Sequence, residues 1–162
     1  MKTLIAALFA ALFAVGSLGA TPAAAQDAQT EEARVLATVT AFMAAFDAKD
    51  ADAMMPLLAN GAHLAMVEER EGEDRSNVLG LAGLVTSLSA APMIIAEPLD
   101  VKAVMVGGPV AMVWADYGFY MDGAQSHCGV DIFTLMRIDD EWKIATITYS
   151  HIEDACDDAP LP

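Results

Sequence analysis

Residues 93–151 of this chain alternate between apolar and polar positions, and this period of two constrains the fold more than any other feature. Four such runs occur, at 93–105, 110–121, 125–138 and 141–151. The runs are separated by short turn sequences, and Asp122-Gly123 between two alternating runs is a strong hairpin signal. The pattern predicts four long antiparallel strands.

The residues before these strands have the period of helices. Apolar side chains recur every three or four positions from 30 to 49, which is typical of an amphipathic helix. Asp50 is a good cap for a short second helix that ends before Asn60-Gly61. A strand at 63–67, a solvated loop at 68–74 and a third helix from 76 to about 90 follow. Helices that precede such a sheet predict an α+β fold, in which a strongly curved antiparallel sheet carries three N-terminal helices on one face.

The first 25 residues differ from the rest, since they contain 18 hydrophobic residues and no acid. Lys2, an apolar run at 4–18 and small residues before Gln26 are typical of a secretory signal peptide. A transmembrane anchor is the alternative, but the run is shorter than the roughly 20 residues that span a bilayer. We therefore expect a cleaved leader at 1–25, a domain at 26–152, an acidic tail at 153–162, and a periplasmic or secreted location.

Charge narrows the range of partners. The chain has 8 Lys and Arg against 23 Asp and Glu, and removing the leader with its single lysine leaves 7 minus 23, or −16. Nucleic acids and anionic membranes attract clustered basic residues, so neither is expected as a partner. A small molecule remains the expected ligand.

The chain has two cysteines, Cys128 and Cys156. In an oxidising compartment the simplest prediction is one disulfide between them, with two separate thiols as the alternative.

The two hairpin turns predict a register. If Asp122-Gly123 and the next pair, Asp139-Asp140, are two-residue turns, Asp131 lies opposite Trp114 and Thr148, with Asp116 one step along the same face. Burial under the helices raises the pKa of a carboxyl group, which then acts as a base or hydrogen-bond donor near neutral pH. Asp131 and Asp116 are therefore the candidate catalytic residues.

Both faces of the predicted sheet are rich in apolar residues. One face can pack on the helices, and we expect the other to meet a second copy of the chain in a two-fold homodimer.

Metal and cofactor sites are not predicted. The spacing of His63, His127 and His151 matches no metal motif. The ten methionines fall mostly at core-like positions in periodic elements, which favours core filling over copper binding.

Four stretches carry a resemblance to a known family. They are 39–50 (VTAFMAAFDAKD), 57–62 (LLANGA), 129–137 (GVDIFTLMR) and 141–145 (EWKIA). Their order and motifs resemble the nuclear transport factor two-like superfamily, the cone-shaped fold of ketosteroid isomerase, scytalone dehydratase and SnoaL-like polyketide cyclases. The resemblance implies a cone with a mostly apolar pocket, which hosts many unrelated functions.

The resemblance also places individual residues. Asp131 falls where ketosteroid isomerase keeps its protonated oxyanion-hole aspartate, whereas Met66 and Phe42 stand where its base and tyrosine would be. Steroid isomerisation is therefore not implied. The expected ligand-pocket residues are Phe42, Met66, Trp114, Tyr120, His127, Phe133, Thr146 and Thr148.

Three functional hypotheses follow. The first is an exported binding module that holds a small apolar or aromatic molecule in its cone. The second is a lyase, isomerase or cyclase that uses Asp131 as acid, base or hydrogen-bond donor. The third is a structural role with a cone filled by its own side chains.

Overall fold

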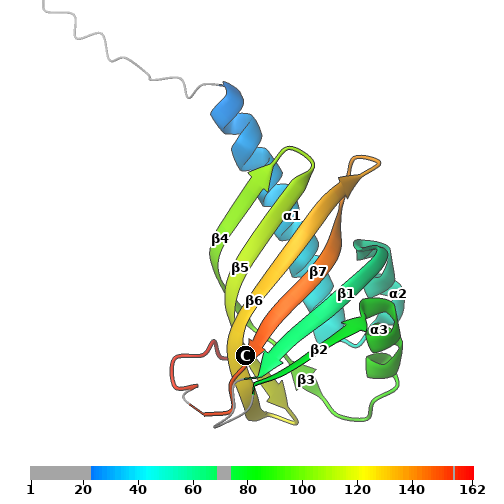
Figure 1. The fold of residues 1–162 in the computed structure, drawn as a ribbon, viewed down its shortest axis with the longest axis vertical. Coiled ribbons are helices and arrows are strands. Elements are labelled where there is room, and N and C mark those ends of the chain that lie inside the picture. The colour runs from blue at the N-terminus through cyan, green and yellow to red at the C-terminus, as the bar shows by residue number, and fades with distance from the viewer. Residues whose placement is uncertain (1–22, 69–73, 155) are drawn as a thin grey trace, which may run out of the picture.

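The computed structural model describes residues 23–68, 74–154 and 156–162. Two helices and a 3-10 turn precede the first strands, and a third helix lies between strands (Figure 1). The elements are α1 (Ala23–Asp47), α2 (Ala51–Met54), η1 (Met55–Leu57), β1 (Leu58–Glu68), β2 (Arg75–Gly80), α3 (Leu81–Ser89), β3 (Ile95–Ala96), β4 (Leu99–Gly107), β5 (Val110–Met121), β6 (Ala124–Ile138) and β7 (Glu141–His151).

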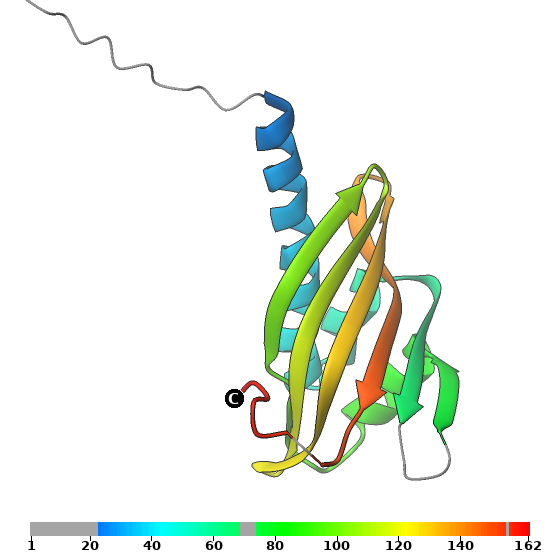
Figure 2. The same cartoon turned by 60° about the vertical axis from the view of Figure 1, so that its left-hand side comes forward.

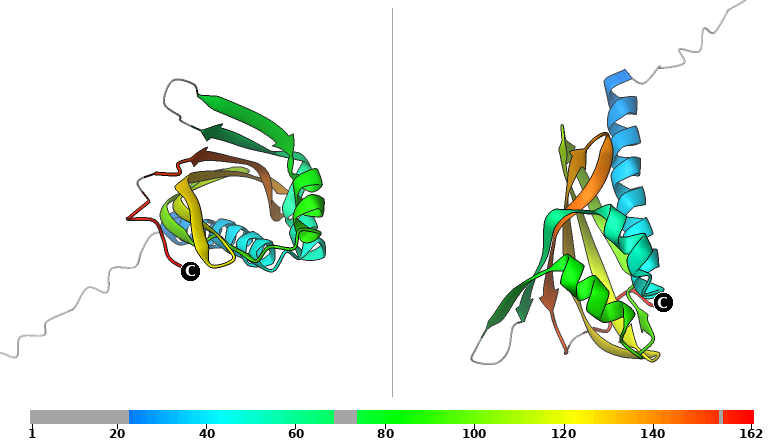
Figure 3. Two further views of the ribbon diagram at one scale, coloured as in Figure 1. Left: turned by 90° about the horizontal axis from the view of Figure 1, so that it is seen from below. Right: turned by 90° about the vertical axis from the view of Figure 1, so that its right-hand side faces the viewer.

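The strands form one curved sheet in the order β2-β1-β7-β6-β5-β3, with β4 also paired to β5. Seen from below, the sheet is strongly curved, and α1 and α3 lie on its concave side (Figure 3). The predicted α+β cone with helices over one face is thereby confirmed. The prediction of a purely antiparallel sheet is wrong, because β1 pairs with β7 in parallel, as in His63 with Thr146. Turn sequences predict the pairing only of strands that follow one another in the chain. β1 and β7 are far apart in sequence, so no turn signal predicts their pairing.

The helices differ from their predictions where strand pairing competes with helix formation. Asp50 caps α2 as expected, and its Oδ1 accepts a hydrogen bond of 3.0 Å from the amide of Ala53. The predicted third helix begins only at Leu81, because 75–80 pairs with β1 as strand β2. The predicted strand 93–105 is split at Pro98, which cannot donate to a ladder, into β3 and β4.

The predicted hairpin turns are confirmed, but the register beyond them is wrong. Asp122 and Gly123 have φ of 51° and 82°, as a type I′ turn requires. Register shifts then follow, at Phe119/Tyr120 between β5 and β6 and at Thr134/Leu135 between β6 and β7. Asp131 consequently pairs with Ala115 and Tyr149 instead of Trp114 and Thr148. A shift of one residue moves every partner side chain to the opposite face.

The core lies between α1, α3 and the concave face of the sheet (Figure 2). Its members include Val35, Val39 and Phe42 from α1, and Val113, Phe133 and Ile144 from the sheet. Near the turn between β6 and β7, Trp142 Nε1 donates a hydrogen bond of 3.0 Å to Glu31 Oε2, which ties α1 to β7.

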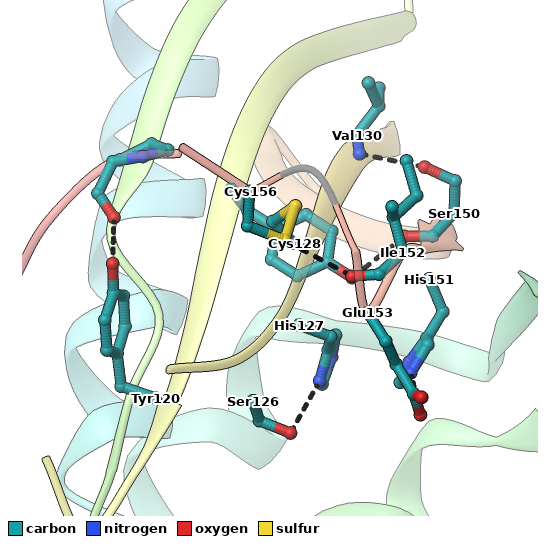
Figure 4. Close-up of a disulfide and its surroundings, with 12 residues drawn as sticks. Tyr120, Ser126, His127, Cys128, Val130, Ser150, His151, Ile152, Glu153 and Cys156 are labelled. Carbon is teal, nitrogen blue, oxygen red and sulfur yellow. Dashed lines mark hydrogen bonds and ion pairs between the residues drawn. A yellow bond between two sulfur atoms is a disulfide. The ribbon is translucent and has the colours of Figure 1, made fainter. Parts of the chain in front are cut away.

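The predicted disulfide is confirmed. Cys128 on β6 and Cys156 in the tail are bonded, with their Cα atoms 5.7 Å apart (Figure 4). Beyond it the tail turns back over β5, where the Tyr120 hydroxyl donates a hydrogen bond of 3.1 Å to the Pro160 carbonyl. The acidic tail is thus held on the sheet by a disulfide and a hydrogen bond.

The predicted signal peptide lies outside the described residues except for its last three. Within the described ranges, no helix combines the length and apolar character needed to cross a bilayer.

Candidate functional site

A cavity of about 190 Å³ lies between α1, α3 and the concave face of the sheet. Most of its lining is apolar, and α3 contributes Leu81, Leu84, Val85 and Leu88. Aromatic rings surround the remaining space; they belong to Phe42, Phe46, Tyr117, Phe119, Phe133 and Tyr149. Such a lining favours the burial of an apolar or aromatic group.

Two carboxyl groups lie in this apolar cavity. Asp131 on β6 is only 3% exposed, and its side chain shares a hydrogen bond with Glu97, which lies between β3 and β4. Burial raises the pKa of Asp131 to about 7. Burial and the neighbouring Asp131 carboxyl raise the pKa of Glu97 well above its usual value. Among the described residues, Asp131 Oδ2 is the one buried side-chain nitrogen or oxygen without a hydrogen-bond partner. The pair therefore holds a proton near neutral pH and has a free acceptor.

Side chains of α1 and of the residues just after it hold the segment that carries Glu97. The amide of Glu97 donates a hydrogen bond of 2.9 Å to Asp47 Oδ1 at the end of α1. Lys49 Nζ donates to the carbonyls of Ala91 and Met93, at 2.6 and 2.7 Å. Burial also raises the pKa of Asp47. These contacts fix the direction from which Glu97 enters the cavity.

Gly129 allows β7 to approach β6 closely beside Asp131. A Cβ atom at Gly129 would lie 2.1 Å from the Ser150 carbonyl oxygen. That carbonyl accepts a hydrogen bond of 2.8 Å from the hydroxyl of Tyr117, and Ser150 Oγ accepts one of 3.0 Å from the amide of Val130. Burial is the main cause of the raised pKa of Tyr117, so this phenol is neutral and serves to orient the ring.

His127 lines the cavity beside the disulfide (Figure 4). Its ring stacks on His151 with the centroids 4.0 Å apart, and its Nδ1 lies 3.1 Å from Ser126 Oγ. Burial, with a smaller contribution from His151, lowers the pKa of His127 to about 4. This imidazole is therefore neutral at physiological pH.

The cavity brings together some of the residues that the sequence indicated. Asp131, Phe42, His127 and Phe133 line it. Met66 lies on β1 opposite Tyr149 but does not belong to the lining.

Five other residues lie outside the cavity, four of them because the register predicted for them was wrong. Trp114 is 40% exposed and pairs with Ile132 on the outer face. Asp116 forms a solvent-accessible ion pair of 3.2 Å with Lys102. The remaining three are Tyr120, which is bonded to the tail, Thr146, which pairs with Thr134, and Thr148, which pairs with Ile132.

Glu97 is the functional candidate that sequence reasoning missed. It falls inside the run at 93–105 that was interpreted as one continuous strand. The available signal is the order Ile94-Ile95-Ala96-Glu97-Pro98, in which a lone acid follows three apolar residues and precedes a strand-breaking proline.

One group of side chains outside the cavity has the composition of a cation site. Glu68, His151 and Glu153 offer ligand atoms that all lie within 4.8 Å of one another. The other two histidines of the chain, His63 and His127, are not part of this group.

Comparison with known proteins agrees with this architecture. The model of a family described as putative lumazine-binding matches residues 30–150. This chain belongs to that family. A search of curated proteins gives no match.

Several solved structures share the fold of this putative lumazine-binding domain. An NTF2-like protein with a cystatin-like fold from Novosphingobium aromaticivorans is 18% identical, with a TM-score of 0.62, and the match covers 86% of this chain and 94% of that one. A putative dehydratase of the NTF2-like family from Streptomyces avermitilis is 22% identical, with a TM-score of 0.58, over 76% and 97% of the two chains. A ketosteroid isomerase-like protein from Erwinia carotovora atroseptica is 18% identical, with a TM-score of 0.56, over 75% and 96%. The nuclear transport factor two-like fold is therefore established.

The family match includes both cavity carboxyls, Glu97 and Asp131, but ends before Cys156. The covalently tied tail therefore lies outside the region that defines this putative lumazine-binding domain.

Proposed function

We propose that this putative lumazine-binding domain binds a small apolar or aromatic molecule in its cavity. The observation that carries the proposal is the free, buried Asp131 Oδ2 inside an otherwise apolar and aromatic lining. An unpaired buried acceptor costs roughly 1–3 kcal/mol, and a ligand with a hydrogen-bond donor removes that cost. The family name also supports a small ligand.

The size of the cavity limits the ligand. An apolar cavity of roughly 150 Å³ holds benzene. The cavity of about 190 Å³ therefore suits one aromatic ring with a short substituent.

We expect 2-phenylethanol to bind with a Kd of about 1 mM or lower, which corresponds to roughly 0.5 kcal/mol for each non-hydrogen atom. Isothermal titration calorimetry measures this affinity. Leu84→Trp, which fills the cavity from α3, should abolish binding, whereas Ser87→Trp on the exposed side of the same helix should leave it unchanged. Equal loss in both variants, or retention in both, argues against the cavity as the site.

An enzymatic role is the second candidate, because the pKa of Asp131 near 7 suits proton transfer at neutral pH. In this proposal Glu97 replaces Asp116 as the second carboxyl. The Streptomyces avermitilis protein, a putative dehydratase, supports the same reaction class, a lyase, with isomerases and cyclases as the related options. Asp131→Asn should lower turnover of an identified substrate by about 10²–10⁴-fold while affinity survives; unchanged turnover would rule out this role.

The location of the protein belongs to the same proposal. We expect export to the periplasm or the medium with cleavage after Ala25, and the disulfide supports an oxidising location. The mass of the mature protein should therefore correspond to a chain that begins at Gln26, and an intact Met1 would contradict this.

The outer face of the sheet supports a homodimer. Large apolar side chains are exposed on it, namely Met105, Val110, Trp114, Met136 and Ile138. Sedimentation equilibrium should give a dimer mass, and Trp114→Glu should shift the protein to monomers. A monomeric wild-type protein at about 100 µM would exclude this interface.

A further inference from the structure

We propose that the cavity selects a small organic cation, an amine or protonated nitrogen base on one apolar or aromatic body, whose N–H groups bind the carboxyl pair of Asp131 and Glu97. This inference rests on the proposed binding function and specifies the ligand class of the same site. It uses three observations: the charge of the lining, the free acceptor and the aromatic rings.

The cavity holds acids without a compensating base. Among the described residues that line it, none is lysine or arginine, and its one histidine, His127, is held neutral by burial. Lys49 is bonded to backbone carbonyls, while Arg34 and Arg137 pair with Glu31 at the other end of α1. A negative charge on the carboxyl pair therefore has no protein cation near it. A cationic ligand supplies the missing positive charge, whereas the carboxyl pair repels an anionic ligand.

The geometry of the pair also requires a donor. Asp131 Oδ2 is buried and has no hydrogen-bond partner, and the Asp131 side chain shares a hydrogen bond with Glu97. A protonated amine carries two or three N–H donors and no acceptor, so it can donate to the carboxyl pair without presenting a second acceptor to it. Hydrogen bonds between an ammonium and a carboxylate are about twice as strong as neutral ones.

Aromatic faces complete the site for a cation. Tyr117 and Tyr149 stand edge to face, with their ring centroids 6.2 Å apart, and the ring of Phe119 lies next to His127 in the same lining. The faces of such rings attract cations by about 2 kcal/mol or more where water is excluded. A neutral ligand of the same shape gains only the apolar contacts.

The test compares two probes of equal size, 2-phenylethylamine and 2-phenylethanol, by isothermal titration calorimetry at pH 7.5 and 150 mM salt. We expect the amine to bind at least about tenfold more tightly than the alcohol. Asp131→Asn and Glu97→Gln should each bring the affinities for the amine and the alcohol to within about twofold of one another. Near-ultraviolet circular dichroism shows whether each variant is folded, and either folded variant is sufficient.

Asp116→Asn is the matched control. It removes one acid from the same sheet, but the Asp116 side chain is 43% exposed and lies outside the cavity. The preference for the amine should persist in this variant, because it comes from the buried pair and not from the overall acidity of the chain.

The outcomes separate this inference from the proposed function. If the alcohol binds as tightly as the amine or more tightly, or if the preference survives in a folded Asp131 or Glu97 variant, the cation inference is wrong and the binding function stands. If neither probe binds, the proposed binding function fails as well. A preference that disappears equally in Asp116→Asn overturns the role of the buried pair.

Discussion

Replacing Gly129 with alanine is expected to lower the free energy of unfolding by about 4 kcal/mol. The added Cβ would lie 2.1 Å from the Ser150 carbonyl oxygen, which is backbone of β7 and cannot rotate away. Overpacking of this kind costs roughly 1–3 kcal/mol. Moving the carbonyl also breaks its bond to the Tyr117 hydroxyl, and the loss of a buried partner adds about 1–3 kcal/mol.

Thermal unfolding followed by circular dichroism measures this effect, and a fall in Tm of more than about 12 °C is expected at roughly 3 °C for each kcal/mol. Gly83→Ala is the control, because a Cβ at this exposed position of α3 meets nothing within 4 Å. Alanine is the better helix former, so this variant should gain up to about 1 kcal/mol. A Gly129→Ala protein that melts within about 2 °C of the wild type would falsify the close approach of the two strands.

Asp131→Asn is expected to change how stability depends on pH. The folded protein keeps the proton of Asp131 up to about pH 7, whereas the unfolded chain loses it near pH 4. Between these values Asp131 keeps a proton in the folded state that it loses in the unfolded chain, so the stabilisation from this group is complete below pH 4 and is lost as the pH rises through 7. Relative to the wild type, the variant should gain about 1.4 kcal/mol for each pH unit in this window, or about 4 kcal/mol in total.

The comparison must be made between variant and wild type at each pH, because His127 has the opposite effect. Its pKa is lowered to about 4 by burial, so its contribution to stability rises over an overlapping range. Urea unfolding at pH 4.5, 5.5, 6.5 and 7.5 gives the difference, with Asp116→Asn as the control outside the cavity. Parallel pH profiles of Asp131→Asn and the wild type would show that Asp131 ionises freely in the folded protein.

Local signals predicted the parts of the fold that depend on neighbouring residues. The Asp122-Gly123 turn, the cap at Asp50 and the amphipathic face of α1 each follow from a few adjacent side chains. The disulfide followed from two cysteines in a chain expected to be exported. The order of helices and strands then placed the helices against one face of the sheet, and the family resemblance implied the cone.

The registers beyond the turns could not be predicted, because they depend on irregularities with no signature in a single sequence. One extra residue near Ser126 and one near Ala145 move Asp131 from Trp114 and Thr148 to Ala115 and Tyr149. That shift exchanges the two faces of β5 and explains why Asp116 and Trp114 were assigned to the pocket. Asp131 was still identified, because the alternation of residues along its own strand decides which face it occupies, whatever the register of the neighbouring strands.

Glu97 depends on the longest range of interactions. Its entry into the cavity requires the break at Pro98, the bond from its amide to Asp47 and the anchoring of 91–93 by Lys49. Asp47 and Lys49 lie about fifty positions earlier in the chain, so the alternating pattern of the strand cannot predict these contacts.

The parallel pair of β1 and β7 determines when the fold can be completed. β5, β6 and β7 are joined by tight turns and can pair as soon as each is synthesised, but β1 must wait for the last strand, more than eighty positions later. Closing such a loop carries an entropic cost before the contacts compensate for it, which slows folding. A ribosome-bound chain that lacks 141–151 therefore leaves the β1–β2 pair without the strand that joins it to the rest of the sheet, and the cavity is complete only after the final strand is released.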